Sequence, residues 1–181
     1  RSLPVVMMIF EPQPLELFAA ANAPARLTRL REKLNYLAES GVDYVLCVRF
    51  DRRFAALIAQ VFIRELLVRR LGVQFLAVGD DFRFGHRRAG DFNLLCEAGR
   101  QHGFEVVDNR SYLVDGERVS STRIRQALAQ GNLEQAARLL GRPYDMNGRV
   151  AHGDRIGRTI GFPTANIHLH RRATPIYGVY A

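Results

Sequence analysis

Cysteine, lysine and long apolar runs are scarce in this sequence of 181 residues. Its two cysteines, Cys47 and Cys96, show no Cys-x-x-Cys spacing, so neither a zinc site nor a disulfide-built scaffold is expected. We predict two buried, reduced thiols in a cytoplasmic protein. No apolar run approaches the roughly 18 residues of a membrane-spanning helix, and we therefore expect no membrane partner.

The residue patterns of several enzyme classes are also missing. Serine, histidine and acidic residues give no Ser-His-Asp arrangement and no pair of carboxylates for acid-base work. His168 and His170 would share one face of a strand, but no third ligand accompanies them, so a histidine metal site is not expected. With 48% apolar and 24% charged residues, the chain has the composition of an ordinary globular protein.

Basic residues outnumber acidic residues by 26 to 18, and 25 of the 26 are arginine, Lys33 being the exception. A net charge of +8 and a pI near 10.3 indicate phosphate-rich partners, either nucleic acid or nucleotides. Arginine offers a planar fork of donors that suits phosphate oxygens. The arginine excess could equally be a compositional habit of the source, so charge alone does not separate these explanations.

Strand and helix signals alternate through the first two-thirds of the chain. Continuous apolar runs predict strands covered on both faces, and helical spacing predicts helices between them, the first capped by Thr28. The predicted strands are 5–10, 42–50, 75–78 and 104–107, and the predicted helices are 28–41, 53–70 and 92–102. Such units form a parallel, doubly wound sheet, which binds ligands beyond the carboxyl ends of its strands. The residues after Phe10, Phe50 and Val78 are therefore candidates for a site.

The last third of the chain is organised differently. Asp115-Gly116 predicts a hairpin turn, and two short helices follow, one from Ser121 or Thr122 to Gly131 and one capped by Asn132 that ends at Gly141. Beyond Pro143 the helical signals give way to short strand-like pieces with glycine turns. We place a domain boundary there, with one domain at 1–143 and the start of a second at 144–181.

A loop rich in glycine and aromatic residues, Gly79 to Gly85, follows the third predicted strand. Glycine permits a close backbone approach, aromatic rings can face a planar ligand, and arginine can meet phosphate. The alternative is a surface loop whose aromatic side chains pack into the core.

A cluster of hydroxyl groups, on Ser120, Ser121 and Thr122, opens the first of the two short helices, and Arg125 follows one turn later. Free backbone N–H groups and the positive end of the helix dipole suit such a position to phosphate. The alternative is an ordinary Ser/Thr cap with solvated arginines.

Glycine and arginine recur between Gly148 and Arg158, and the segment Gly161-Phe162-Pro163-Thr164-Ala165-Asn166 follows. Thr164 and Asn166 carry neutral oxygen ligands that point the same way if the segment is extended. A hard cation such as Mg²⁺ bound to phosphate would accept them. The alternative is a glycine-rich hairpin without a ligand.

These motifs, in this order, resemble the bacterial bifunctional riboflavin kinase/FMN adenylyltransferase family, also called FAD synthetase. The resemblance covers nearly the whole chain and includes further segments. These are Phe10-Glu11-Pro12-Gln13-Pro14, Arg26-Leu27-Thr28 with Glu32-Lys33, Phe50-Asp51 with Phe54-Ala55, Leu140-Gly141-Arg142-Pro143-Tyr144 and Gly178-Val179-Tyr180. Each segment alone is a weak signal, whereas the ordered set is specific.

The resemblance implies a nucleotidylyltransferase domain of Rossmann-like α/β fold with a parallel sheet, followed by part of a β-barrel riboflavin kinase domain. It implies that the kinase transfers the γ-phosphate of ATP to the 5′-hydroxyl of riboflavin. The other domain joins FMN to the AMP part of a second ATP and releases pyrophosphate, and both reactions use Mg²⁺. The expected partners are therefore riboflavin, FMN and ATP rather than nucleic acid.

Roles for individual residues also follow from the resemblance. Ser120, Ser121, Thr122 and Arg125 match a motif that holds ATP phosphates, with Arg125 as the catalytic phosphate contact of the adenylyltransferase. Residues matching the flavin side are Phe10, Glu11, Pro12, Asp80, Asp81, Phe82 and Phe84. Thr164 and Asn166 match positions that hold Mg²⁺-ATP in the kinase, with Gly153 and Arg158 in a covering loop.

Two parts of the family's machinery are absent between Arg1 and Ala181. The family's first nucleotide motif, whose histidines stabilise the transferring phosphoryl group, would lie before Arg1. The general-base glutamate of the kinase would lie after Ala181. We therefore expect a fragment that lacks both ends and catalyses neither reaction by itself, from a parent protein that catalyses both.

Two other classes of protein stay open as alternatives. A nucleotidylyltransferase that acts on another small molecule, such as pantetheine phosphate, would lack the segment from Pro163 to Asn166 and the added β-rich domain. A basic nucleic-acid-binding protein would carry a basic patch interleaved with aromatic residues, whereas these arginines are spread along the chain.

Overall fold

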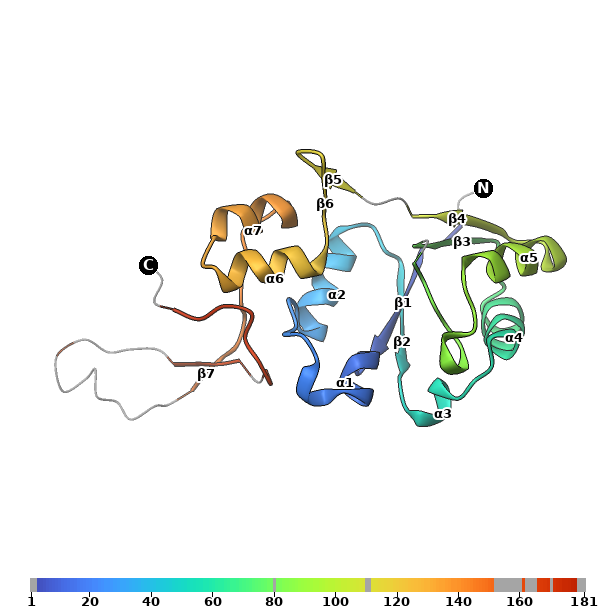
Figure 1. Cartoon of the computed structure of the whole chain (residues 1–181), viewed down its shortest axis with the longest axis horizontal. Coiled ribbons are helices and arrows are strands. Elements are labelled where there is room, and N and C mark those ends of the chain that lie inside the picture. The colour runs from blue at the N-terminus through green and yellow to red at the C-terminus, as the bar shows by residue number, and fades with distance from the viewer. Residues whose placement is uncertain are drawn as a thin grey trace. The chain divides into compact units, whose positions relative to one another are not determined.

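The computed structural model describes residues 3–79, 81–109, 112–151, 161, 166–169 and 171–178. The chain folds into two compact units, and each contains helices and short strands (Figure 1). The first unit consists of Arg1–Met7, Asn22–Leu46 and Val114–Ala181, and the second unit consists of Met8–Ala21 and Cys47–Leu113. The fold is a mixed α/β architecture.

Two pairs of strands are parallel. Strand β1 (Val6–Glu11) pairs with β2 (Tyr44–Arg49), and the N–H of Phe50 donates to the carbonyl of Glu11 at 3.0 Å. Strand β3 (Phe75–Val78) pairs with β4 (Glu105–Asp108), with Phe75 opposite Glu105. Parallel strands joined by helical crossovers are therefore confirmed, whereas the doubly wound sheet as a whole stays a prediction.

In the second unit, one predicted helix is confirmed, one is broken, and a short helix that the sequence did not predict follows β1. Helix α1 (Pro14–Phe18) and the turn η1 (Ala20–Asn22) precede β2, and α5 (Phe92–His102) fills its predicted range. The side chain of Asp91 caps α5 by accepting the N–H of Leu94 at 2.9 Å, and Gly103 ends it in a left-handed conformation.

The single helix predicted at 53–70 is wrong, because the chain breaks after α3 (Arg52–Ala55) and resumes as α4 (Ala59–Val61). Helix α4 continues into the π-helical segment η2 (Phe62–Arg70). At the break, the carbonyl of Leu57 accepts a hydrogen bond from the N–H of His86 at 2.6 Å. Gly85 packs so close that a Cβ there would lie 2.7 Å from the backbone nitrogen of Ala59. Contacts from a distant loop therefore override the local helical pattern.

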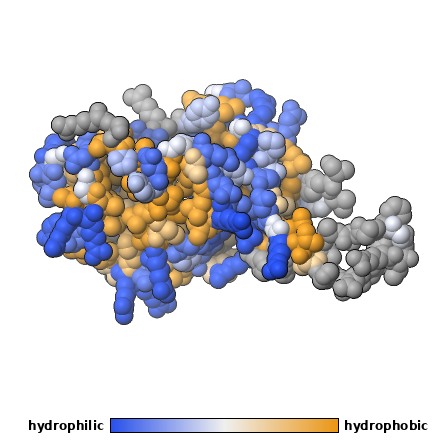
Figure 2. Space-filling view, turned by 180° about the vertical axis from the view of Figure 1, so that it is seen from behind, coloured by the Kyte–Doolittle hydropathy of each residue, from blue (hydrophilic) through white to orange (hydrophobic). Residues whose placement is uncertain are grey.

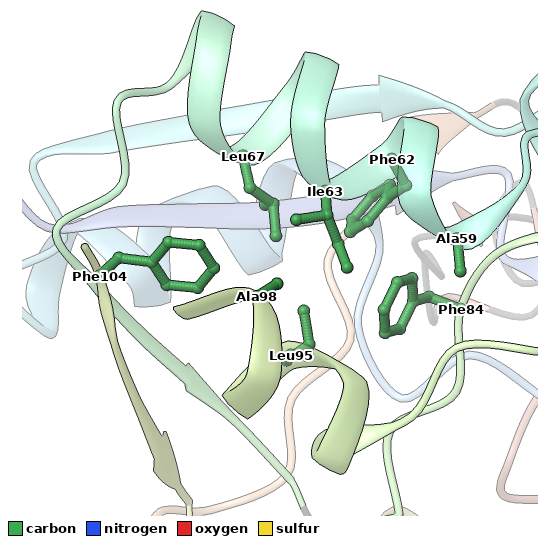
Figure 3. Close-up of a cluster of buried hydrophobic side chains, with 8 residues drawn as sticks. All are labelled: Ala59, Phe62, Ile63, Leu67, Phe84, Leu95, Ala98 and Phe104. Atoms are coloured by element: carbon green, nitrogen blue, oxygen red, sulfur yellow. The ribbon is translucent and has the colours of Figure 1, made fainter. Parts of the chain in front are cut away.

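The core of the second unit lies between η2 and α5. Figure 3 shows side chains from these two elements pointing toward one another, with Phe84 and Phe104 at opposite ends of the cluster. Leu67 of η2 is 2% exposed and Leu95 of α5 is fully buried. Leu76 and Val78 of β3 pack against this cluster, so the two elements cover one face of that strand.

The prediction that the strands are covered on both faces is wrong for the described residues. Side chains alternate along a strand, and Phe75 of β3 is 52% exposed although Leu76 beside it faces the core. Val6 and Met7 at the start of β1 are exposed as well. On the side of the molecule that Figure 2 shows, apolar side chains lie together among polar ones.

The first unit contains three helices and two short strand pairs within its described residues. The helices are α2 (Leu30–Glu39), α6 (Ser121–Ala129) and α7 (Leu133–Leu140). The hairpin of β5 (Leu113–Val114) and β6 (Glu117–Arg118) turns at Asp115-Gly116, and β7 (Arg149–Ala151) is antiparallel to β8 (Asn166–His168). The predicted hairpin and both short helices are confirmed.

Helices α6 and α7 pack against each other around a second apolar core (Figure 1). Its buried members are Ile124, Ala127, Leu128, Ala136, Leu139 and Ile176. Thr28 does not cap α2 as predicted, because α2 begins one residue later, after Arg29. The carboxylate of Glu32 accepts the N–H of Arg29 at 2.6 Å instead, so a side chain inside the helix supplies the cap.

Two further predictions concern the burial of the cysteines and the absence of a membrane-spanning helix. Both cysteines are free thiols, as expected, but Cys47 lies at an exposed position of β2, so the prediction that it is buried is wrong. Cys96 is half-buried. Within the described ranges, no helix is long and apolar enough to span a membrane.

Candidate functional site

The first flavin-side segment ends strand β1 in the second unit. The ring of Phe10 lies edge-on to Phe50 with 5.6 Å between centroids, and 5.7 Å from the ring of Phe54. Glu11 and Pro12 follow and are half-buried. The segment therefore lies at the carboxyl end of a parallel strand, where the sequence predicts ligand binding.

The second flavin-side segment is a loop held by its own backbone and by the core. Phe84 and Gly90 exchange hydrogen bonds of 3.0 and 2.9 Å, and Gly90 lies so close to the Phe84 ring that a Cβ there would be 2.6 Å from it. Phe84 is 7% exposed, so the alternative of an aromatic residue packed into the core describes this residue. Phe82 is half-buried and stacks on Phe84 at 5.6 Å, and Asp81 is exposed. Asp80 lies outside the described residues.

Ring contacts join the two flavin-side segments. Phe54, which touches Phe10, lies 6.2 Å from Phe62, and Phe62 lies 5.1 Å from Phe84. Phe62 is itself buried in the core, so the path runs through the packed interior of the second unit. The structure therefore brings segments more than 70 residues apart in sequence onto one aromatic framework.

The candidate phosphate site opens helix α6 in the first unit. The Ser120 hydroxyl accepts the N–H of Arg123 at 3.3 Å, which makes Ser120 the cap of the helix. Ser121 and Thr122 occupy the first turn and are exposed, so their hydroxyl and N–H groups are accessible. A capped helix start with accessible donors can accept an anion.

Arg125 is fixed one turn into α6. Its Nε donates to the carbonyl of Ala25 at 2.6 Å, and the side chain is half-buried. Burial lowers the pKa of the Arg125 guanidinium from its usual value, because the charge has lost part of its solvation. No described residue bonds to its two terminal nitrogens, which leaves them able to meet phosphate oxygens.

Most kinase-side candidates lie outside the described residues, namely Gly153, Arg158 and Thr164. Asn166 begins β8, where its backbone is opposite Ala151 of β7. Among the residues that the structure describes, no group of three histidine, cysteine, aspartate or glutamate side chains could hold a metal ion. His170 lies outside the described residues.

The first unit contains a buried ion pair that no pattern in the sequence predicted. Arg171, 2% exposed, donates to both carboxylate oxygens of Glu32, 5% exposed, at 3.2 and 3.0 Å. Arg171 also donates to the carbonyl of Arg26 and the hydroxyl of Tyr144, and Glu32 accepts the N–H of Asn147 at 3.1 Å. Glu32 and Arg171 are 139 residues apart, so no local pattern could have revealed the pair.

These features together define a class of protein. Parallel strands with candidate segments at their carboxyl ends, together with a helix start lined by hydroxyl groups and arginine, are typical of nucleotide-binding α/β proteins. Residues 1–123 match the FAD synthetase family, and residues 140–181 match the riboflavin kinase family. The chain belongs to the FAD synthetase family.

Curated relatives agree with this assignment. The chain is 65% identical over 181 residues to the bifunctional riboflavin kinase/FMN adenylyltransferase of Escherichia coli K12, which covers 100% of this chain and 58% of the relative. It is 54% identical over 180 residues to the Haemophilus influenzae protein of the same name, with 99% and 58% covered. The chain thus spans under two-thirds of the length of these relatives.

A solved structure has the same fold. A crystal structure described as that of a macrolide-efflux protein from Streptococcus pneumoniae is 31% identical to this chain, with a TM-score of 0.74. The alignment covers 97% of this chain and 56% of that protein.

Proposed function

We propose that the protein containing this chain phosphorylates riboflavin to FMN and then adenylylates FMN to FAD, using ATP in both steps. The observation that carries the proposal is the succession of FAD synthetase and riboflavin kinase matches along one chain. The curated relatives are about twice as similar in sequence as the structure described as an efflux protein, so their names carry more weight.

In the adenylyltransferase step, a phosphate oxygen of FMN bonds to the α-phosphorus of ATP and pyrophosphate leaves. Such a reaction depends on positioning and on stabilising charge, rather than on a covalent enzyme intermediate. We assign the ATP phosphates to Ser120, Ser121, Thr122 and Arg125, in a domain of Rossmann-like fold. The hydrogen bond from Arg125 to Ala25 supports this role because it orients the guanidinium before ATP arrives.

We assign the flavin to the aromatic framework of the second unit. Phe10, Glu11, Pro12, Asp80, Asp81 and Phe82 would contact it. Phe84 is buried beneath Phe82 and would act by holding that ring in place. This division of roles refines the expectation from the sequence, which treats the two phenylalanines alike.

In the kinase step, which comes first, the 5′-hydroxyl oxygen of riboflavin bonds to the γ-phosphorus of ATP and ADP leaves. Thr164 and Asn166 would hold Mg²⁺-ATP, with Gly153 and Arg158 covering it. Hydroxyl and amide oxygens are ligands that suit Mg²⁺, which when bound neutralises charge on the phosphates. The antiparallel β7–β8 pair is compatible with the first strands of a barrel, and the domain boundary near residue 143 stays part of this proposal.

The proposal predicts that Arg125→Ala in the full-length protein separates the two activities. Losing a charge-assisted phosphate contact costs about 1.5–3 kcal/mol, so FAD formation should fall about tenfold to a hundredfold. Riboflavin phosphorylation should not change. Rates of both reactions, measured by separating the flavins chromatographically, provide the test.

Arg138→Ala is the matched control for that variant. Arg138 lies on the neighbouring helix α7, pairs with Asp115 and belongs to no candidate site. It should leave both rates unchanged. An equal fall of both activities in Arg125→Ala would show that Arg125 does not belong to the adenylyltransferase alone.

A further inference from the structure

A groove of about 590 Å³ opens in the first unit between the start of helix α2 and the segment that leads into β7. Arg29 and Arg31 line one side, and Asn147, Gly148 and Arg149 line the other. Its volume is within the range of small-molecule sites. None of the candidate residues from Ser120 to Arg125 lines it.

The charge of the groove is strongly positive. Glu32 is the one carboxylate among the lining residues, and Arg171 already neutralises it through two hydrogen bonds. The guanidinium groups of the three lining arginines make no hydrogen bond or ion pair with any described residue. Three unpaired guanidinium groups around one groove repel each other, and an anion bound among them would relieve that repulsion.

The groove is also built from fixed parts. The carboxylate of Glu32 accepts the N–H of Arg29 on one wall, at 2.6 Å, and the N–H of Asn147 on the other wall, at 3.1 Å. One buried side chain therefore ties the backbone of both walls together before any ligand arrives. The amide of Asn35 adds a neutral donor to the same lining.

From this arrangement we propose that the groove binds a small anion that carries several phosphate groups. Two or three linked phosphates would supply enough negative charge to meet all three arginines, and each guanidinium offers a fork of donors to phosphate oxygens. Arg29 and Arg31 lie within the FAD synthetase match, whereas Arg149 lies within the riboflavin kinase match. A ligand in this groove would therefore contact both parts of the chain and affect how they are held together.

The first experiment maps arginine modification by phenylglyoxal in the full-length protein, with and without inorganic tripolyphosphate. Peptide mass spectrometry should show saturable protection of Arg29, Arg31 and Arg149. Three exposed arginines outside the groove, Arg70, Arg100 and Arg172, should be modified at an unchanged rate. Equal modification of the groove arginines in both samples, or equal protection of all six, would overturn the proposal.

The second experiment measures tripolyphosphate binding by calorimetry. It compares a variant with Arg29→Gln, Arg31→Gln and Arg149→Gln against a control with Arg70→Gln, Arg100→Gln and Arg172→Gln. Both lose three positive charges, but only the first should weaken the groove site, by about tenfold or more. Both variants are made in an Arg125→Ala background, which removes that proposed ATP phosphate contact, and both keep the proposed kinase site, so a difference between them reports on the groove whether or not the proposed function holds. Equal binding by the two triple variants would contradict a groove site.

ATP replaces tripolyphosphate in a parallel titration. Tighter binding of ATP than of tripolyphosphate, lost only in the groove variant, would identify a nucleotide as the ligand class. Equal affinities would show that the phosphates alone are recognised. Both results support a binding site in the groove. The proposal is refuted if replacing all three groove arginines changes the affinity for neither anion.

Discussion

The described core of the second unit is apolar, whereas the first unit buries an ion pair beside its apolar core. In the second unit, Leu67, Leu95 and Phe84 lie in one cluster, all drawn from 59–104. In the first unit, Glu32 and Arg171 lie 139 residues apart and are nearly inaccessible to solvent. The two units therefore differ in how their interiors respond to substitution.

The two interiors should tolerate different kinds of substitution. An apolar core loses stability in proportion to the atoms removed and the cavity left behind. A buried ion pair responds asymmetrically, because removing one partner leaves the other charge buried without compensation, while replacing both can be nearly neutral. The stability of the first unit should thus depend on the presence of both Glu32 and Arg171. The stability of the second unit should depend on the volume of its buried side chains.

The largest effect is expected for Glu32→Gln. The substitution keeps the shape of the side chain but leaves the Arg171 charge unpaired, at a cost of about 3–5 kcal/mol in the free energy of unfolding. Denaturant unfolding of the full-length protein measures this cost. The double variant Glu32→Met with Arg171→Met should recover most of it, and a double variant less stable than the single variant would refute the asymmetry.

The next effect is expected for Leu95→Ala in the second unit. Leu95 is fully buried, so its truncation should cost about 2–5 kcal/mol. Leu15→Ala is the control, because Leu15 lies in the same unit and is 55% exposed; it should cost less than about 0.5 kcal/mol. Thermal unfolding of both variants gives the comparison, and equal losses would show that the second unit is not packed around Leu95.

The smallest effect is expected for Asp145→Asn, as a change in pH dependence. Burial raises the pKa of Asp145, but hydrogen bonds from Tyr36 and Asn147 and the charge of Arg142 lower it by more, so it lies below the usual 3.8. The stability that the carboxylate contributes is present above pH 3.8 and is lost as the pH falls through the lower, folded-state pKa. The variant should therefore show a shallower loss of stability in acid.

Asp108→Asn is the control for this prediction. Asp108 is exposed, and its carboxylate has no hydrogen bond or ion pair with any described residue. Melting temperatures recorded from neutral to acidic pH should have the same slope in Asp108→Asn as in the unsubstituted protein. An unchanged slope in Asp145→Asn as well would show that its hydrogen bonds do not affect stability.

Local signals in the sequence predicted the elements whose ends are set by neighbouring residues. Asp91, Ser120 and Asn132 cap their helices with their own side chains, and each acts within three residues of its position. The parallel pairing of β3 and β4 followed from the strand-helix-strand order. These features needed no knowledge of distant contacts.

Features set by distant contacts could not be predicted. The break before Ala59 depends on a hydrogen bond from His86, and the burial of Glu32 depends on Arg171. For Phe84 the sequence allowed both a ligand contact and core packing, and the structure places it in the core. The roles assigned to Ser120, Arg125 and the other site residues stay predictions, because they concern a ligand rather than the fold.

The central claim is that the protein containing this chain performs two successive ATP-dependent reactions on riboflavin. Its most direct test incubates the full-length protein with riboflavin, Mg²⁺ and ATP labelled at either the γ- or the α-phosphate. We expect that FMN carries only the γ-label and that FAD carries both the γ-label and the α-label. Unmodified riboflavin, or FAD without the α-label, would contradict it.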